Sequence, residues 1–463
     1  MTELATMDFH PQPQPGEARP WAFPAPDRTA LDNGLTVLRC HRPGQQVVAV
    51  EVLLDAPLHA EPAGLDGVAT ITARAFSEGT DKHTAKEFAA ELERCGGNLD
   101  AQANHSRVRL TLEVPASRLP KALGLLADAL RSPAFAPDDI QRLVRNRLEE
   151  IRHETVDPVR RATRALATAL FEQDDRMARP RQGTEETVAR IRPADVRAFY
   201  ERHVRPAATT IVVVGEFYDT ELRTLFSECF GDWAGASATP SSAPPSTADV
   251  TPRLLIIDRP GAVQTHLLMG GISPNRHHRV WPAHVLGTYC LGGSLNSRLD
   301  RVLREEKGYT YGMRAFTQVL SSAPDGSGVA MATISGSVDT ASTCSALADL
   351  QTLLGTYTAH GIIDDERDAA IENLVGVAPL RFETSSAVAG TFADQVEQHL
   401  PDNYQAQFYA RLAETSAAEA SAAANVFSTD RLVTVLVGDA SQIERSVRGL
   451  EMGEVRTLRS GSR

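Results

Sequence analysis

The stretch ATTIVVVGEFYDTELRTLF at residues 208–226 contains a β-branched run, a Val-Gly-acidic turn at 214–216 and an amphipathic helix pattern. A second stretch, RLVTVLVGDASQIERSVRGL at residues 431–450, repeats this order around its own Val-Gly-acidic turn at 437–439. β-Branched residues favour strands, and apolar residues three and four positions apart predict a helix. The two stretches begin 223 residues apart, far more than the roughly 20–50 residues of a solenoid repeat. We therefore expect two distant copies of one domain.

The boundary between the two copies is a stretch of small and polar residues. Residues 234–252, AGASATPSSAPPSTADVTP, lack long apolar side chains and are crowded with Ser, Thr, Pro and Ala. This composition is typical of a linker, because it offers too little apolar surface to bury. The linker separates an N-terminal domain at 29–233 from a C-terminal domain at 253–450. The Pro-rich head, residues 1–28, and the tail, residues 451–463, are expected to be disordered.

Each half is expected to be an α+β domain, a mostly antiparallel sheet with helices packed on one face. Apolar residues alternate over 108–114 as in a half-buried strand, and residues 84–87 form a capping box that opens a helix. Asp157-Pro158 predicts a helix break, because the residue before proline avoids the helical region. The first half is expected to have strands at 35–40, 47–54 and 108–114 and helices at 64–77, 117–130 and 138–171. The second half is expected to have strands at 254–258 and 264–269, a helix ending at Gly292-Gly293, a helix at 296–306 and a strand from Tyr309.

Charge and composition exclude several classes of function. With 47 Lys and Arg against 59 Asp and Glu, the 463-residue chain has a net charge of −12, so it lacks the positive field that gathers a nucleic acid. No run approaches the roughly 18 consecutive apolar residues of a membrane span. The five cysteines are widely spaced and never form a C-x-x-C pair, a usage that suits a reducing compartment. We expect a cytoplasmic protein without nucleic-acid or membrane partners.

Three segments carry a family resemblance that extends from about residue 29 to residue 450. They are GVATITARAFSEGT at 67–80, RNRLEEIRHETVDP at 145–158 and GGSLNSRLDRVLREEKGYTYGMRAF at 292–316. Together with the repeat, they resemble the pitrilysin/insulinase family of zinc metallopeptidases, the inverzincins. The resemblance implies an H-x-x-E-H motif in the first segment and a third zinc ligand, a Glu, in the second.

The first segment departs from the family at every position of its motif. Thr70, Ala73 and Arg74 stand where the resemblance implies His, Glu and His. A catalytic zinc needs about three donors such as imidazole or carboxylate, and these side chains supply none. The third ligand position is Glu150, or Glu149 if the register slips by one residue. We therefore expect no metal in this chain and hypothesise that the Arg74 guanidinium pairs with Glu150 instead. The alternative is that both side chains face solvent.

The third segment gives a positive prediction for substrate binding. Arg304 and Tyr311 are seven positions apart, and the resemblance implies that an Arg and a Tyr at this spacing bind the substrate or the developing oxyanion. Two such donors can converge on one carbonyl or carboxylate. Gly292 and Gly293 are expected to end a helix and to let a substrate backbone approach closely. The alternative places Arg304 on a solvated helix face and Tyr311 in a strand as an ordinary aromatic, with Tyr309 as a competing candidate.

The resemblance and its departures together predict a non-catalytic subunit. The chain is expected to bind a peptide and to pair with a second chain that carries H-x-x-E-H and zinc, as a heterodimeric metalloendopeptidase. The isolated chain would be inactive, and the peptide would add as a strand to a sheet edge. Two other classes stay open: a peptide-binding or scaffold pseudoenzyme without a peptidase partner, and a stand-alone hydrolase that uses Ser294 or a cysteine. The sequence leaves open which peptides are processed and whether a homodimer or a heterodimer forms.

Overall fold

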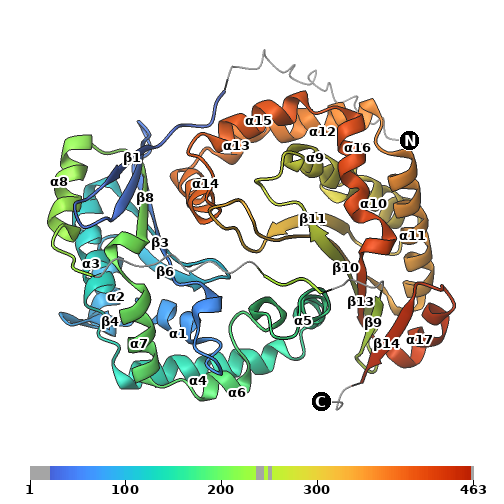
Figure 1. The fold of residues 1–463 in the computed structure, drawn as a ribbon, viewed down its shortest axis with the longest axis horizontal. Helices are drawn as coiled ribbons and strands as arrows, with labels where there is room; N and C mark the ends of the chain where they lie inside the picture. Colours follow the sequence, from blue (N-terminus) through green and yellow to red (C-terminus); the bar gives the residue numbers. More distant parts are fainter. Residues whose placement is uncertain (1–20, 236–244, 249–252, 460–463) are drawn as a thin grey trace, which may run out of the picture.

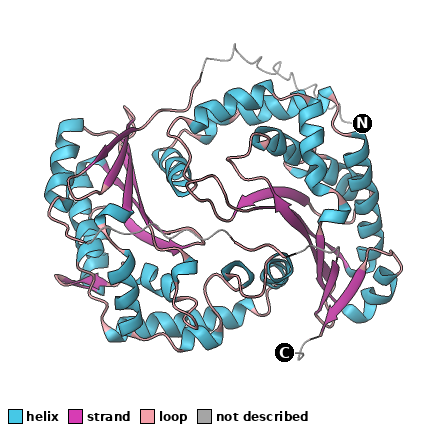
Figure 2. Ribbon diagram, viewed as in Figure 1, coloured by secondary structure: helices cyan, strands magenta, loops and turns pink. Residues whose placement is uncertain are grey.

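The computed structural model describes residues 21–235, 245–248 and 253–459, which form two halves that face each other (Figure 1). Each half contains one large sheet, and most helices lie on the outside of the molecule (Figure 2). The order of strands and helices in the first half recurs in the second, as the sequence repeat predicts. The fold is the expected α+β class with two related halves.

The first sheet has the strand order β1-β2-β8-β3-β7-β6 among the described residues. Neighbouring strands run antiparallel except β2 and β8, which are parallel. The strands are β1 Asp27–Ala30, β2 Thr36–His41, β3 Val47–Leu54, β6 Asn98–Ala103, β7 Val108–Pro115 and β8 Thr209–Gly215, and a small separate hairpin is formed by β4 Gly79–Thr80 and β5 His83–Thr84. The three strands expected in this half correspond to β2, β3 and β7.

The second sheet has the order β11-β12-β10-β13-β9-β14 within the same described ranges. Its strands are β9 Arg253–Asp258, β10 Gln264–Ser273, β11 Met313–Val319, β12 Ala330–Asp339, β13 Val433–Gly438 and β14 Glu454–Leu458. β13 is parallel to β9 and antiparallel to β10, and β8 in the first sheet is likewise parallel to one neighbour and antiparallel to the other. The two Val-Gly-acidic stretches therefore occupy equivalent places, which supports the duplication.

The helices begin and end largely where local signals place them. Thr84 and Glu87 form the expected capping box at the start of α2, and Asp157 caps α5 by accepting a hydrogen bond from the backbone N of Arg160. The helices of the first half are α1 Val68–Ala75, α2 Ala85–Arg94, α3 Leu119–Arg131, α4 Pro137–Glu154, α5 Pro158–Leu170, α6 Glu185–Ala189, α7 Pro193–His203 and α8 Asp219–Phe230. Those of the second half are α9 Trp281–Gly292, α10 Arg298–Asp300, α11 Thr343–His360, α12 Asp364–Gly376, α13 Ala378–Arg381, α14 Ser385–Glu397, α15 Tyr404–Glu414, α16 Ala417–Ala423 and α17 Ala440–Arg448.

The inner face of each sheet is covered by a helix from the other half (Figure 1). Helix α14 packs on β3 and β8 of the first sheet, and α5 packs on β10 and β13 of the second. Strand β8 shows why both faces are apolar: Ile211 and Val213 join the core of the first half, whereas Val212 and Val214 join the cluster that includes α14. Such continuous apolar runs are typical of strands that are buried on both faces. Within each half, helices thus cover one face of the sheet, as expected. The other face of each sheet is covered by a helix from the opposite half.

A partly buried ion-pair network fixes α14 to the first sheet. Arg109 on β7 donates from Nε to Glu51 at 2.8 Å and from Nη1 to Asp394 of α14 at 2.9 Å. Glu51 is buried and also accepts a hydrogen bond from the Thr111 hydroxyl at 3.0 Å. Burial alone would lower the pKa of Arg109, but the carboxylates of Glu51 and Asp394 outweigh it and raise the pKa. Arg109 therefore stays charged and ties the two halves together.

The end of the Pro-rich head is packed rather than disordered. Phe23 is buried in the large core of the second half, and Trp21 stacks on Phe382 with ring centroids 5.7 Å apart. Aromatic rings bury a large apolar surface, which offsets the entropy lost on ordering the backbone. The expectation of disorder is therefore wrong for residues 21–28, and residues 1–20 lie outside the described residues.

Parts of the tail and linker also belong to the fold. Residues 454–458 form β14 on the edge of β9, where they satisfy backbone groups that an edge strand leaves unpaired. The expectation of a disordered tail is wrong for this segment. In the linker, Thr247 forms an isolated bridge with Phe171 at the end of α5. Residues 236–244, 249–252 and 460–463 lie outside the described residues.

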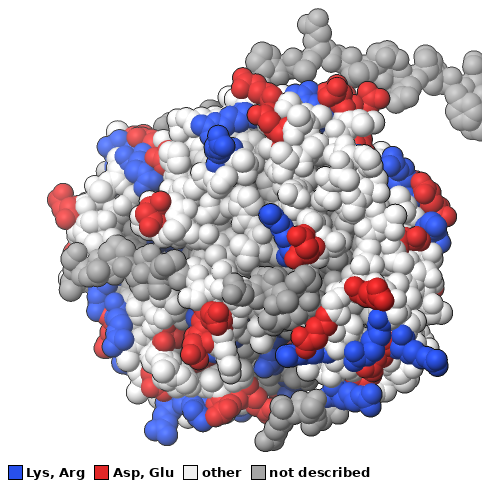
Figure 3. All heavy atoms as spheres, turned by 45° about the vertical axis from the view of Figure 1, so that its right-hand side comes forward, with Lys and Arg blue, Asp and Glu red and all other residues white. Residues whose placement is uncertain are grey.

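Charged side chains of both signs are interspersed over the face of the molecule in Figure 3. Elsewhere in the chain, as on α17, neighbouring charges form ion pairs such as Arg448 with Glu444. None of the helices in the described part of the chain combines the length and the apolar character needed to cross a bilayer.

Candidate functional site

Helix α1 carries the positions of the lost metal motif, and a buried carboxylate fixes its start. Glu61 accepts hydrogen bonds from the backbone N of Gly67 at 2.9 Å and of Ala69 at 3.0 Å. Free N–H groups at a helix start stabilise such a carboxylate. Arg176 donates to Glu61 from Nη2 at 2.8 Å, and both side chains are buried. The sequence gives no signal for this pair, because 115 positions separate its members.

The three motif positions face different surroundings. Thr70 and Ala73 are 3% and 0% exposed, and the Thr70 hydroxyl has no hydrogen-bond partner among the described residues. Arg74, in the last turn of α1, reaches α4. Its Nη1 lies 2.8 Å from Oε1 of Glu150, and its Nη2 lies 2.9 Å from Oε2. The structure therefore contains the hypothesised pair as a bidentate contact, the strongest geometry for these groups.

A second arginine extends the pair into a network along α4. Arg147, which is 1% exposed, donates from Nη1 to Glu150 at 3.0 Å. It also holds Glu154 with two contacts of 2.8 Å and 2.9 Å. Burial acts to raise the pKa of Glu150, but hydrogen bonds from Arg74 and Arg147 outweigh it and lower the pKa. The spacing of three and seven residues along one helix face could have indicated Arg147 from the sequence. Glu149 pairs with the exposed Arg152 instead, so Glu150 is the residue that faces α1.

This set of side chains does not fit a metal ion. A zinc site of the implied kind needs two imidazoles and a carboxylate with a free lone pair. Here a hydroxyl and a guanidinium stand at the two imidazole positions, a methyl group stands at the position of the general base, and two guanidinium groups occupy the oxygens of Glu150. No group of three His, Cys, Asp or Glu in metal-binding geometry occurs in the ranges that the structure describes. The cationic Arg74 fills the role of the ion as a cross-link between α1 and α4.

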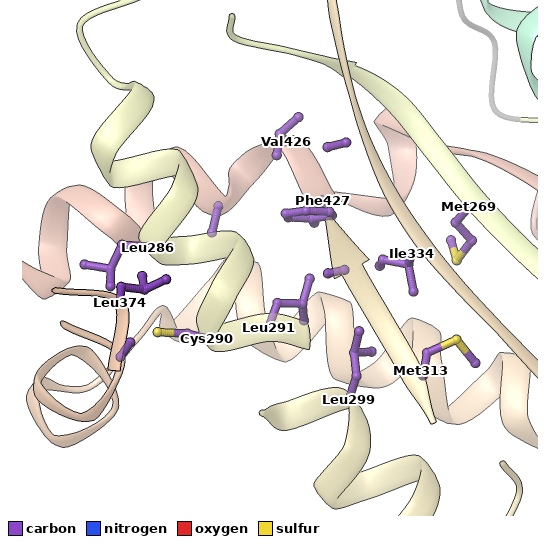
Figure 4. Packing of buried hydrophobic residues seen from close by; sticks show 14 of the residues in the cluster. Met269, Leu286, Cys290, Leu291, Leu299, Met313, Ile334, Leu374, Val426 and Phe427 are labelled. Carbon is purple, nitrogen blue, oxygen red and sulfur yellow. The ribbon is translucent and has the colours of Figure 1, made fainter. Parts of the chain in front are cut away.

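The Arg304 segment rests on the core of the second half. Helix α9 is followed by α10 and by the π-helix η5 Arg301–Glu306. Leu299 and Met313, which flank η5, are buried with Leu291 in one cluster (Figure 4). This packing holds the segment in place while Arg304 remains partly exposed.

The two glycines before this segment have structural roles. Gly292 is buried, and an added Cβ would lie 2.4 Å from the backbone N of Ala315 on β11. The expected approach of a substrate to Gly292 is therefore wrong, because a strand of the same chain fills that space. Gly293 is exposed and forms the C-cap of α9, so it ends the helix as expected.

Tyr311 lies in the loop between η5 and β11. The strand begins at Met313, so the expected start at Tyr309 is wrong. The Thr310 hydroxyl donates to the carbonyl of Gly312 at 3.0 Å and accepts from its N–H at 3.1 Å. A local turn of this kind competes with strand pairing. Tyr311 is 94% exposed, which leaves its hydroxyl free to meet a ligand.

The neighbours of Tyr311 distinguish it from the competing tyrosine. Tyr309 donates its hydroxyl to Asp349 at 3.1 Å, so that group is already engaged. The Arg304 side chain is 39% exposed, and its Nη1 lies 3.8 Å from Oδ2 of the fully buried Asp300. Asp300 also accepts a hydrogen bond from the backbone N of Met313 at 2.9 Å. Asp300 thus joins η5 to the start of β11. Its position one helical turn before Arg304 suggests the contact with Arg304 but not the contact with β11.

The cysteines give little support to a nucleophile of their own. Burial raises the pKa of Cys40 to about 11 and that of Cys290 to about 12. A thiol with so high a pKa is a poor nucleophile at neutral pH, because little thiolate forms. None of the five cysteines, all of them described, pairs with another.

Two family models match consecutive parts of this chain. Residues 36–185 match the description Insulinase (Peptidase family M16), and residues 190–374 match Peptidase M16 inactive domain. An uncharacterized zinc protease of Mycobacterium bovis is 30% identical over 303 residues, which cover 65% of this chain and 68% of that protein. The chain belongs to peptidase family M16. The uncharacterized zinc protease YmxG of Bacillus subtilis is 25% identical to this M16 chain over 363 residues, 78% of this chain and 85% of the relative.

Solved structures show the same fold. A peptidase M16 inactive domain from Pseudomonas fluorescens superposes with a TM-score of 0.80 at 20% identity and covers 89% of this chain and 98% of its own. A protease from Helicobacter pylori gives a TM-score of 0.79 at 19% identity, with 90% of this chain and 100% of its own covered. The family resemblance expected from the sequence is confirmed, and the inactive-domain match includes both Arg304 and Tyr311.

Proposed function

We propose that this M16 chain is the non-catalytic, substrate-binding subunit of a heterodimeric zinc metalloendopeptidase that acts on peptides. The observation that carries the proposal is a contrast within one chain. Arg74 and Arg147 occupy Glu150 where the family motif would hold a metal, whereas the exposed donors of Arg304 and Tyr311 make no side-chain hydrogen bond within the described residues. A partner chain with H-x-x-E-H would supply zinc and its chemistry, and this chain would bind and orient the peptide.

The surroundings of Tyr311 support peptide binding. The loop leads directly into β11, an edge strand in the described part of the second sheet. An edge strand can accept an extended peptide through main-chain hydrogen bonds. A peptide on this edge would have its carbonyl groups near Arg304 and Tyr311, since both precede the strand. The guanidinium and the phenol can each donate to such a carbonyl.

A reducing cytoplasm is the proposed location, since unpaired cysteines persist there.

Co-expression with M16 chains that carry H-x-x-E-H tests the proposal. We expect a complex that cleaves peptides only when both chains are present. Arg304→Ala is expected to lower kcat/KM by about tenfold to a hundredfold and Tyr311→Phe by less, because each removes a donor to the reacting peptide. Neither change should dissociate the complex in size-exclusion chromatography.

Arg301→Ala is the matched control, since Arg301 lies on the same helix, is exposed and has no assigned role. An unchanged rate in both Arg304→Ala and Tyr311→Phe would contradict the substrate-binding role. Recovery of the chain without any peptidase partner, with peptides bound and uncleaved, would favour a scaffold pseudoenzyme instead.

A further inference from the structure

A second arginine lies beside Arg304 on the same buried carboxylate. Arg314, at the start of β11, places Nη1 2.5 Å from Oδ2 of Asp300, and Arg304 places Nη1 3.8 Å from the same oxygen. The two guanidinium nitrogens are therefore at most 6.3 Å apart, the two contacts laid end to end. Both arginines carry exposed surface, with side-chain exposures of 40% and 39%.

The charges at this place do not balance. Asp300 is 0% exposed and supplies one negative charge to two permanently positive guanidinium groups. Its other oxygen is already used by the backbone N of Met313. One positive charge thus remains on two arginines that precede Tyr311 by seven positions and follow it by three.

Other charged groups nearby leave this excess in place. Lys307 pairs with Asp349 at 3.4 Å, which balances that neighbour. Glu305 and Glu306 follow Arg304 on η5 and are exposed, and among the described residues neither forms an ion pair with Arg304 or Arg314. A ligand with a negative charge would complete the set.

We infer that the substrate site selects peptides that carry a carboxylate, and that Arg314 binds this group together with Arg304. Two guanidinium groups at this separation can hold the two oxygens of one carboxylate, the ligand that arginine recognises best. Asp300 is a positioning residue, because its buried carboxylate aligns both arginines. The carboxylate can belong to a Glu or Asp side chain or to the C-terminus of the peptide. This inference rests on the proposed peptide-binding function.

Fluorescence anisotropy with two matched pairs of labelled ten-residue peptides tests the inference on the full-length chain. One pair differs by a central Glu or Gln, with both C-termini amidated. The other pair lacks acidic residues and differs by a free or an amidated C-terminus. We expect the carboxylate peptide of at least one pair to bind about tenfold more tightly than its neutral partner. The pair that discriminates identifies the source of the carboxylate.

Variants at Arg314 separate binding from structure. Arg314→Gln should remove the discrimination while the affinity for the neutral peptides changes by less than about twofold, and Arg314→Lys should restore part of it because it keeps the charge. Arg301→Gln, on η5 with Arg304 but with no ion pair to Asp300 among the described residues, should leave the discrimination intact. Equal binding of charged and neutral peptides by the unaltered chain would overturn the inference and leave the proposed function standing. Failure to bind any of the four peptides would contradict the proposed function, and the inference with it.

Discussion

The two arginine sites of this chain, Arg74 on α1 and Arg304 on η5, use the same side chain in opposite ways. Arg74 has both of its terminal nitrogens on Glu150, which is also held by Arg147. Arg304 makes one long contact of 3.8 Å to a carboxylate that it shares with Arg314. In the first site the carboxylate of Glu150 holds both terminal nitrogens of Arg74 at hydrogen-bond distance, whereas in the second site Arg304 stays beyond hydrogen-bond distance of Asp300. An internally satisfied site stabilises a fold, whereas an unsatisfied site is available to a ligand.

The lost motif thus shows how a binding site becomes a structural one. A metal ion would have drawn α1 and α4 together through three donors. The guanidinium of Arg74 now joins the same two helices through one ion pair, with Arg147 as a second clamp. The proposed ligand site belongs to the other half, and Figure 1 shows α1 and α4 in one half of the molecule and α10 and β11 in the other.

Restoring the metal donors of the first site should have the largest effect. In the triple variant Thr70→His, Ala73→Glu, Arg74→His, two imidazoles join a Glu150 that Arg74 no longer occupies. We expect zinc to rise from none to about one ion per chain, because the set then matches a catalytic zinc site. Elemental analysis of protein purified with zinc and then dialysed measures this.

Arg74→His alone is the control for the triple variant and should bind no zinc, since one imidazole and one carboxylate are too few. A triple variant with native circular dichroism and no zinc would show that the spacing of α1 and α4, rather than the side chains, excludes the ion.

Removal of Arg147 should have the next largest effect. Arg147→Met keeps the apolar length but leaves Glu150 and Glu154 with less compensation, which we expect to lower the free energy of unfolding by about 2 kcal/mol. The value is below that of a fully buried pair, because the Glu150 and Glu154 side chains are 41% and 25% exposed and water screens them. Urea unfolding measures it. Arg152→Met, which removes an exposed pair with Glu149, should change stability by less than about 0.5 kcal/mol; equal losses in both variants would mean that burial of Arg147 adds nothing.

Protonation of Glu150 and Glu154 in acid should have the smallest effect. The arginines lower the pKa of Glu150 and Glu154 below their ordinary value of 4.5 in the folded chain. A lowered pKa stabilises the fold above pH 4.5, and the stabilisation is lost as the pH falls through the folded-state value. The difference in unfolding free energy between the unaltered chain and Arg147→Met should therefore shrink as the pH falls below 4.5 and the two carboxylates take up protons. A difference that stays constant over this pH range would show that the stability lost in Arg147→Met does not depend on the charge of the carboxylates.

The sequence predicts the halves well because their signals are local. Alternation at 108–114, the capping box at Thr84 and the break at Asp157-Pro158 each depend on neighbouring residues, and all appear in the structure. The exchange of α5 and α14 depends on contacts between segments far apart in the sequence, such as α14 with β3 and α5 with β13, which no local pattern specifies. One signal was present: a run of four apolar residues in β8 suits a strand buried on both faces.

The candidate site also has one part that the sequence predicts and one part that it does not. The sequence predicts the pair of Arg74 and Glu150, because both residues stand at metal-ligand positions of the family motif and such positions lie close together in the fold. The loop at Tyr311 does not, because a single hydroxyl, that of Thr310, turns the chain before the strand can begin. The sequence does not single out Arg314, because arginine is so common in this chain that one more carries little information. Without Arg314, its partner Asp300 is not singled out either.

The exchanged helices set an order of events during synthesis. The first sheet is complete in sequence when β8 ends at Gly215, yet α14, which covers its inner face, ends at Glu397. A ribosome adds roughly 5–20 residues per second, so the strands of the nascent domain expose an apolar face for roughly ten to thirty-five seconds. Neither half can finish folding before the other is made. Chaperone demand should therefore fall on the first half of the newborn chain, and circular permutants that bring α14 forward should need less of it.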